Sequence, residues 1–279
     1  KNYRPISLSS VLGKLLEKVL SHRIQVYAVK KRLFGLQCGF QINRNTTDIL
    51  NTFIQQIYSN LDNGNDTNII YTDFSKAYDS TWILGLIYKL HANGIRNNIL
   101  KFLYSFLSTR YTKVTLKDTA SQNYKQTIGL PQGSSLSPIL YILYINDMEF
   151  PAKLNKFVSL GSFADDCAIW SHGSAADNIQ EKLQEALDHF IKWCREWKIL
   201  VNADKCKHMV IPAKASPRVD PMPKDESIDE SNDESKDESK EEIVTKQVNG
   251  NNNNGYHQLL RDLYNKYQPS FPEPTNGVY

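Results

Sequence analysis

The stretch Thr67-Asn68-Ile69-Ile70-Tyr71-Thr72-Asp73-Phe74 decides the fold of this 279-residue chain. Its apolar run is short and β-branched, which is typical of a buried strand. The strand ends on a carboxylate, Asp73, and a charge in apolar surroundings is costly unless a cation or a basic partner compensates it. We therefore expect a buried strand whose final carboxylate has such a partner.

Helical and extended patterns alternate on both sides of this strand. Helical spacing of apolar residues predicts helices over 11–29, with Ser10 as N-cap, and over 46–61, 82–91, 96–107, 135–147 and 176–197. Further strands are expected over 111–117, 122–128, 157–163, 167–170 and 206–211. Strands and helices mixed in this order indicate an α+β domain that ends near residue 212.

Asp165 and Asp166 form a second acidic site, in a tight turn between two apolar segments. A single aspartate here would most simply be a turn former or a cap. Together with Asp73, however, the pair could converge at the strand ends of one sheet and hold divalent cations. Two such ions about 4 Å apart clamp the attacking and leaving oxygens of a phosphoryl transfer.

The loop Gly129-Leu130-Pro131-Gln132-Gly133 is a third candidate site. Its glycines allow a close backbone approach to a ligand, and the Gln132 amide offers both a donor and an acceptor. By itself the loop is equally compatible with an ordinary turn that opens the helix after it.

In order along the chain, residues 71–79, 129–134 and 163–166 resemble motifs A, B and C of reverse transcriptases, in the form found in non-LTR (LINE-type, jockey-like) retrotransposons. Other stretches that resemble this family are residues 3–8, 17–24, 39–48, 144–147 and 197–205. The resemblance covers residues 1–211. It implies a truncated right-hand polymerase, with partial fingers over 1–66, a palm with some fingers elements over 67–212, and no recognisable thumb.

The resemblance also implies an RNA-directed DNA polymerase that takes an RNA template, a DNA primer and dNTPs. Asp73, the Phe74 carbonyl, Asp165 and Asp166 would hold two Mg²⁺ ions, with Mn²⁺ as a substitute. The primer 3′-hydroxyl would attack the α-phosphate, and pyrophosphate would leave. Lys205, in the family's motif D, would protonate that leaving group, although a solvated surface lysine is an equal alternative.

Four more residues would bind the nucleotide. Tyr78 would stack under the sugar and exclude a 2′-hydroxyl, its alternative being an ordinary core tyrosine. Gln132 and Gly133 would contact the incoming nucleotide, and Arg44 would bind the triphosphate, since a guanidinium suits phosphate oxygens. Gln41 stands where the family usually has arginine, which weakens one phosphate contact.

Charge is distributed unevenly along the chain. The net charge of +3 combines +9 over residues 1–223, −7 over 224–242 and +1 over the last 37 residues. A basic body suits a polyanionic partner such as nucleic acid. Residues 213–255, with four Asp-Glu-Ser repeats and an Asn/Gly run, predict an acidic and Asn-rich disordered linker, and residues 256–279 a tail with one short helix.

Composition disfavours several other classes of protein. No apolar run approaches the ~20 residues of a membrane span, and no signal peptide is visible. The four cysteines lack CxxC spacing, which favours buried free thiols over a zinc site at Cys194, Cys206 and His208.

The alternative to an active polymerase is a truncated or domesticated remnant that binds nucleic acid without polymerising. The missing initiator Met suggests a fragment. The resemblance alone implies an intracellular, nuclear location.

Overall fold

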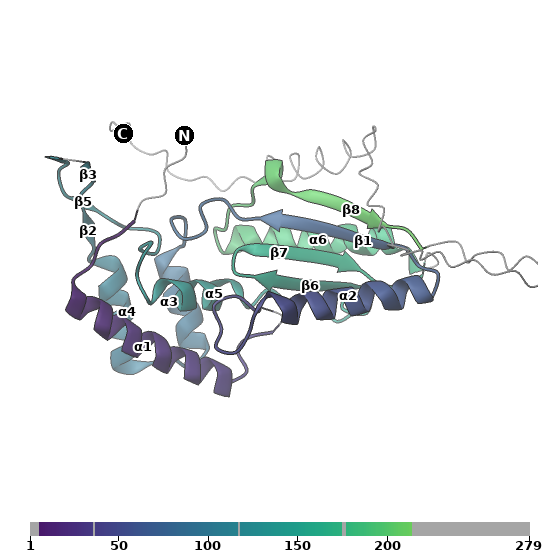
Figure 1. The fold of residues 1–279 in the computed structure, drawn as a ribbon, viewed down its shortest axis with the longest axis horizontal. Helices are drawn as coiled ribbons and strands as arrows, with labels where there is room; N and C mark the ends of the chain where they lie inside the picture. Colours follow the sequence, from purple (N-terminus) through teal and green to yellow (C-terminus); the bar gives the residue numbers. More distant parts are fainter. Residues whose placement is uncertain (1–5, 36, 117, 175–176, 214–279) are drawn as a thin grey trace, which may run out of the picture.

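A computed structural model describes residues 6–35, 37–116, 118–174 and 177–213. An antiparallel sheet lies at its centre, with strands in the order β6–β7–β1–β8 (Figure 1). These strands are β1 (Thr67–Asp73), β6 (Val158–Phe163), β7 (Asp166–Ser171) and β8 (Lys207–Ile211). The strand predicted over 67–74 is confirmed, and it has a neighbour on each side.

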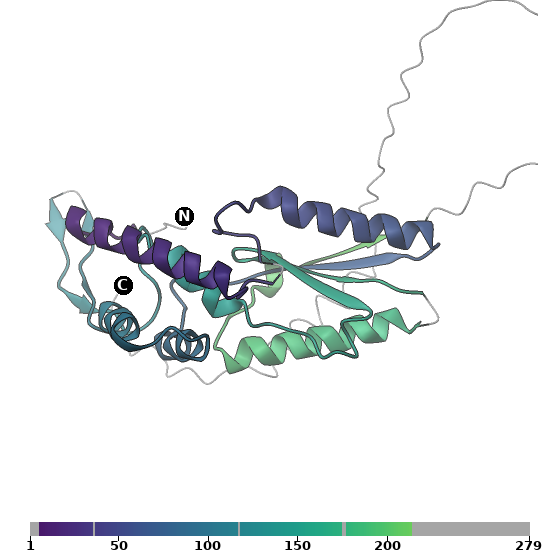
Figure 2. The ribbon, with the colours of Figure 1, turned by 90° about the horizontal axis from the view of Figure 1, so that it is seen from below.

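Two helices, α2 (Thr46–Asp62) and α6 (Ile179–Glu196), lie on opposite faces of this sheet (Figure 2). On one face, Phe53 of α2 packs edge-on against Trp170 of β7, with ring centroids 5.0 Å apart. On the other face, Phe190 of α6 stacks on Phe74, just beyond β1, at 6.0 Å. Because both faces are covered, Ile69 and Ile70 at the centre of β1, which point to opposite faces, are both buried.

A second group of helices lies beyond the end of the sheet where β1 finishes (Figure 1). It consists of α1 (Val11–Lys30), α3 (Ile83–Ala92), α4 (Asn97–Ser108) and α5 (Ser137–Ile145). Helix α5 is apolar and buried around nearly its whole circumference, which makes it a core helix, and Pro138 stands in its first turn, where proline is tolerated. Ser10 caps α1 as predicted, its hydroxyl accepting the Gly13 N–H at 3.0 Å.

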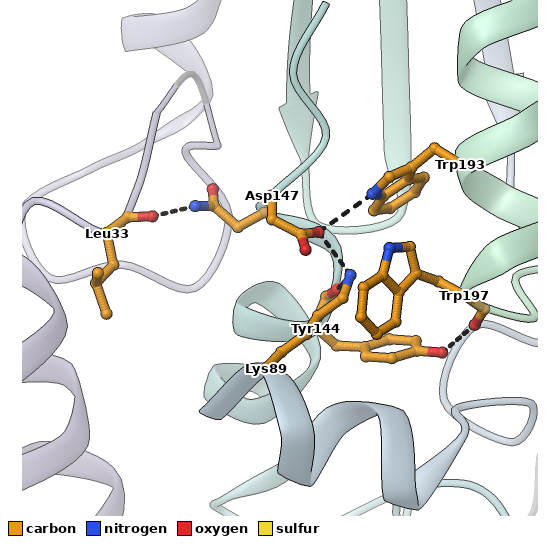
Figure 3. A network of polar contacts seen from close by, with 7 residues as sticks. Leu33, Lys89, Tyr144, Asp147, Trp193 and Trp197 are labelled. Atoms are coloured by element: carbon orange, nitrogen blue, oxygen red, sulfur yellow. Dashed lines mark hydrogen bonds and ion pairs between the residues drawn. The ribbon is translucent and has the colours of Figure 1, made fainter. Parts of the chain in front are cut away.

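A buried lysine ties α3 and α5 of this group to the C-terminal end of α6 (Figure 3). Lys89 of α3, with 3% of its side chain exposed, donates to the Tyr144 carbonyl of α5 at 2.6 Å and to the Asp147 carboxylate at 2.5 Å. Its ammonium group lies 3.7 Å from the ring centroid of Trp197 and 4.7 Å from that of Trp193, at the end of α6. Aromatic faces and a carboxylate together compensate a charge that burial alone would make costly.

The segment between α4 and α5 differs from its prediction. In place of strands over 111–117 and 122–128 it has two short ladders, which pair β2 (Tyr111–Thr112) with β5 (Tyr124–Lys125) and β3 (Thr115–Leu116) with β4 (Thr119–Ala120). Nearly all of these residues are exposed. Without a buried face, nothing holds longer strands in register.

The four cysteines are buried and free, as predicted. Across the described ranges, no helix is long and apolar enough to cross a membrane. The linker and tail predicted over 213–255 and 256–279 lie outside the described residues, apart from Ala213.

Candidate active site

The three predicted catalytic aspartates lie at the same end of the sheet. Asp73 is the last residue of β1 and stands opposite Asp166, the first residue of β7, in the antiparallel pair. Asp165 is next to them, in the two-residue turn that joins β6 to β7. The sheet therefore brings together carboxylates from segments that are far apart in the sequence.

Mutual repulsion makes this cluster a place for a cation. Burial raises the pKa of Asp166, the charges of Asp165 and Asp73 raise it further, and Lys205 opposes the rise. Neighbouring carboxylates disfavour each other's charged form unless a positive charge offsets them. The cluster is thus stabilised by any cation that binds beside it.

Lys205 supplies only a weak counter-charge. Its Nζ lies 3.2 Å from Asp73 Oδ2, but its side chain is 66% exposed, and solvent screens such a pair strongly. The pair lacks the geometry of a hydrogen bond, so the buried Oδ2 atom has no hydrogen-bond partner among the described residues. A buried carboxylate oxygen of this kind is a suitable ligand for a hard cation.

The backbone adds a further oxygen at this end of the sheet. Phe74 forms an antiparallel bridge with Val201. Ser75 N–H donates to the Leu200 carbonyl at 2.7 Å, and Asn202 N–H donates to the Asp73 carbonyl at 2.8 Å. Neither of these two hydrogen bonds uses the Phe74 carbonyl. The donors fit Mg²⁺ by type. In the described part of the chain, however, no three acidic, His or Cys side chains close around one point as a metal site.

Tyr78 lies close both to the aspartates and to α5. Its ring stacks on Tyr141 of α5, with centroids 5.1 Å apart and planes 23° apart. Burial raises the pKa of Tyr78 to about 12, and the charge of Asp165 adds to that rise. A half-buried ring beside the carboxylates agrees with the predicted sugar-stacking position, while its contact with Tyr141 suits the core-tyrosine alternative equally well.

The loop that carries Gln132 and Gly133 is held from two sides. Gln132 Nε2 donates to both carboxylate oxygens of Asp79, at 2.8 and 2.9 Å, and the Gln132 carbonyl accepts from Ser7 N–H at 2.6 Å. Gly133 has φ +103°, and the Ser7 carbonyl oxygen lies 2.9 Å from the place a Cβ would take. While this contact lasts, the Nε2 donor of Gln132 is engaged by Asp79, and only the Oε1 acceptor of the amide is left for another contact.

Arg44, like Gln132 and Gly133, is a predicted site residue without a hydrogen bond or ion pair to the three aspartates among the described residues. Its side chain is exposed in the loop before α2, next to the N-cap Asn45. Burial raises the pKa of Cys38, and the positive charge of Arg44 lowers it in part. None of the ion pairs among the described residues involves Arg44.

Comparison with known proteins gives the family. Residues 1–247 match the family model described as reverse transcriptase (RNA-dependent DNA polymerase). The chain belongs to this family. It is 29% identical over 213 residues to the RNA-directed DNA polymerase from mobile element jockey of Drosophila funebris, which is 75% of this chain and 23% of the relative. The Drosophila melanogaster jockey polymerase is 28% identical, with the same coverage. This reverse transcriptase chain therefore spans about a quarter of the length of those relatives.

Solved structures share the fold of this chain. Apo telomerase from Candida tropicalis, truncated from its C-terminal domain, matches with a TM-score of 0.53 at 16% identity, over 72% of this chain and 41% of that chain. Telomerase from the same organism in complex with a TWJ fragment of telomeric RNA gives 0.52 at 13% identity, over 75% and 35%. The α+β polymerase fold and the family that motifs A, B and C predict are confirmed.

Two buried side chains that contact the candidate site are absent from the sequence-based prediction. Glu17 of α1 accepts from Ser134 Oγ at 2.7 Å and from Ser135 N–H at 2.8 Å, just before α5. Glu17 lies on the same face of α1 as the buried residues Ile24 and Ala28. A charged residue at this helical spacing could therefore have been recognised from the sequence. Gln37, which bonds the backbone of Ala164, lies in a loop, where no periodicity singles it out.

Proposed function

We propose that this chain carries the nucleotidyl-transfer core of a retrotransposon reverse transcriptase, which adds dNTPs to a primer 3′-hydroxyl on an RNA template. The observation that carries the proposal is the carboxylate cluster where β1 ends and β7 begins, with a buried Asp73 oxygen that lacks a hydrogen bond. Family membership supports the reaction class, and the +9 charge of residues 1–223 suits nucleic acid. Family resemblance favours a nuclear location.

Asp73, Asp165, Asp166 and the Phe74 carbonyl would hold two Mg²⁺ ions, with Mn²⁺ as a substitute. When bound, such ions supply Lewis-acid stabilisation to the attacking and leaving oxygens. The protein's own part is to keep these donor oxygens in place at the end of a rigid sheet, so that little reorganisation is needed as charge develops.

Lys205 would change partner during the reaction. It pairs with Asp73 through a largely exposed side chain, so little energy opposes its release. Its ammonium group would then protonate the pyrophosphate that leaves when the 3′-hydroxyl attacks the α-phosphate.

The nucleotide itself would contact four other residues. The ring of Tyr78 would lie under the sugar, where a 2′-hydroxyl would clash. Gln132, once released by Asp79, and Gly133 would contact the incoming nucleotide. Arg44 would reach the triphosphate, for which its exposed guanidinium is well suited.

A second candidate function is that of a remnant that binds nucleic acid without polymerising. The net charge of +9 over residues 1–223 favours it, because such a charge suits RNA whether or not the carboxylates carry out transfer. RNA binding through the basic body would survive in such a remnant.

Primer extension by the full chain separates the two candidates. We expect Mg²⁺-dependent extension of oligo(dT) on poly(rA), with no extension above background for Asp165→Asn. Asp188→Asn, an exposed aspartate on α6, is the matched control and should extend like the wild type. Equal extension by Asp165→Asn and the wild type would contradict the proposal. No extension by the wild type or by either variant, together with salt-sensitive RNA binding, would favour the remnant.

A further inference from the structure

A buried glutamine holds the turn that carries Asp165. Gln37 is 3% exposed, and its side-chain amide bonds the backbone of Ala164 at two points. Its Nε2 donates to the Ala164 carbonyl at 3.1 Å, and its Oε1 accepts from the Ala164 N–H at 2.9 Å. The same Oε1 accepts from Gly39 N–H at 2.7 Å. All the hydrogen-bonding groups of Ala164 are thus satisfied by one side chain.

The loop around Gln37 is seated directly on this turn. Gln37 forms a parallel bridge with Ser162 near the end of β6, and Cys38 N–H donates to the Ser162 carbonyl at 3.0 Å. At Gly39 a Cβ would stand 2.3 Å from the Ala164 nitrogen, so only glycine allows this approach. The segment before α2 therefore continues the sheet edge up to the catalytic turn.

The turn needs such support because its backbone is strained. Ala164 has φ +56°, in the left-handed region, at the first position of a two-residue hairpin turn where glycine is the usual residue. A strained residue keeps its conformation only where its surroundings over-determine it. Ala164 is also buried, so water cannot replace the hydrogen bonds that Gln37 makes.

We propose that Gln37 is a positioning residue for Asp165: its amide fixes the Ala164 backbone and thereby sets where the neighbouring carboxylate points. The inference rests on the proposed function, in which Asp165 is a metal ligand. Gln37 touches no reacting atom, so it acts through the turn alone. Its loss should loosen the turn and weaken the grip of the carboxylates on Mg²⁺.

The test compares Gln37→Met with Gln37→Glu in the full chain. Gln37→Met keeps the length of the side chain and removes all three bonds. Gln37→Glu keeps the two acceptor bonds, but its ionised carboxylate loses the donor to the Ala164 carbonyl and adds a buried negative charge beside it. It is the second variant for the exchange measurement if Gln37→Met does not fold.

Asn60→Leu is the stability-matched control. Asn60 is also a buried amide, and it bonds Thr67 Oγ1 at 2.7 Å and the Ser171 carbonyl at 3.2 Å. Thr67 and Ser171 stand at the end of β1 and β7 that is farthest from the aspartates. The control thus removes comparable bonds from the same sheet without touching the turn.

Two measurements decide the inference. Hydrogen exchange of the Ala164 amide should accelerate about tenfold or more in Gln37→Met, less in Gln37→Glu, and not in Asn60→Leu. The Mg²⁺ concentration that gives half-maximal primer extension should rise most in Gln37→Met, less in Gln37→Glu, and not in Asn60→Leu.

Exchange in Gln37→Met no faster than in Asn60→Leu would overturn the inference, and so would faster exchange with an unchanged Mg²⁺ requirement. If the wild type extends no primer, the proposed function fails instead, and exchange alone then decides whether Gln37 fixes the turn.

Discussion

Glu17 is a carboxylate buried in a helix interface, 4% exposed, and its two donors, Ser134 and Ser135, belong to the loop after Gly133. No ion pair among the described residues offsets its charge. Glu17→Leu leaves the Ser134 hydroxyl and the Ser135 N–H without their acceptor, and we expect the free energy of unfolding to fall by about 2–4 kcal/mol. Glu17→Gln keeps an acceptor oxygen and removes a buried charge, so its change should stay within about 1 kcal/mol.

Urea unfolding of both variants measures this difference. Glu196→Gln is the control, because Glu196 is 59% exposed and its pair with Lys192 spans 4.0 Å, so its loss should change stability by less than about 0.5 kcal/mol. An equal fall in the free energy of unfolding for Glu17→Gln and Glu17→Leu would show that the loop requires the charge of Glu17 and not its two hydrogen bonds.

Residues of the site were predictable where local chemistry marks them. Asp73 ends an apolar strand and Asp165 stands in an acidic turn, so each is conspicuous within a few neighbours. Gln37 is not, because its partner Ala164 is distant in the sequence and no local pattern connects them. The contact between Gln132 and Asp79 was equally hidden, since it depends on how two loops approach in space.

At the scale of elements, the Lys89 cluster predicts a pH dependence (Figure 3). Burial lowers the pKa of Lys89 to about 8, against the raising effect of Asp147. As the pH rises from about 8 toward the unfolded value of about 10.5, the folded chain loses a proton that the unfolded chain keeps. The contribution of Lys89 to the unfolding free energy therefore rises, by about 1.5 kcal/mol between pH 8 and 9.5. The aromatic faces favour the ammonium form and reduce this rise.

The measurement is the difference in unfolding free energy between the wild type and Lys89→Met, followed from pH 7 to 9.5. The difference is needed because buried tyrosines and cysteines have raised pKa values and lower the stability over part of the same range. Lys192→Met, at a side chain that is 71% exposed, serves as control. Parallel curves for the wild type and Lys89→Met would contradict the prediction.

Elements with a strong apolar period were predictable almost to their ends. The helix predicted over 11–29 is Val11–Lys30, and the helix predicted over 46–61 is Thr46–Asp62. The ladders between α4 and α5 were overestimated, because their length depends on burial that the alternation of residues cannot report. The bridge between Phe74 and Val201 could not be predicted either, because the two residues are far apart in the sequence, one before α6 and one after it.

At the scale of the whole molecule, residues N-terminal to α2 contact both loops of the candidate site. Ser7 and Glu17 bond the loop 132–135, while Gln37 bonds the turn that carries Asp165. A displacement of these residues would reach both loops at once. We therefore expect a change in these N-terminal residues to affect both the carboxylate cluster and the loop that carries Gln132.

Charge gives the last prediction, which rests on the proposed binding of nucleic acid. Residues 224–242 carry a net −7 beside a body of +9, and a tethered polyanion competes with RNA for the basic surface. Replacing the acids by their amides should raise RNA affinity about three- to tenfold near 50 mM salt, and the gain should fade near 300 mM as screening shortens the range of charge. The ten residues are Asp225, Glu226, Asp229, Glu230, Asp233, Glu234, Asp237, Glu238, Glu241 and Glu242.

The control for this experiment is a chain in which residues 224–242 are permuted, with composition and length kept. Because the effect depends on charge and not on order, the permuted chain should bind RNA like the wild type, as measured by fluorescence anisotropy across the same salt series. A permuted chain that binds as tightly as the amide variant would show that a specific sequence in the segment, and not its charge, restrains the basic body. An amide variant with wild-type affinity at low salt would show that the acidic segment does not compete with RNA at all.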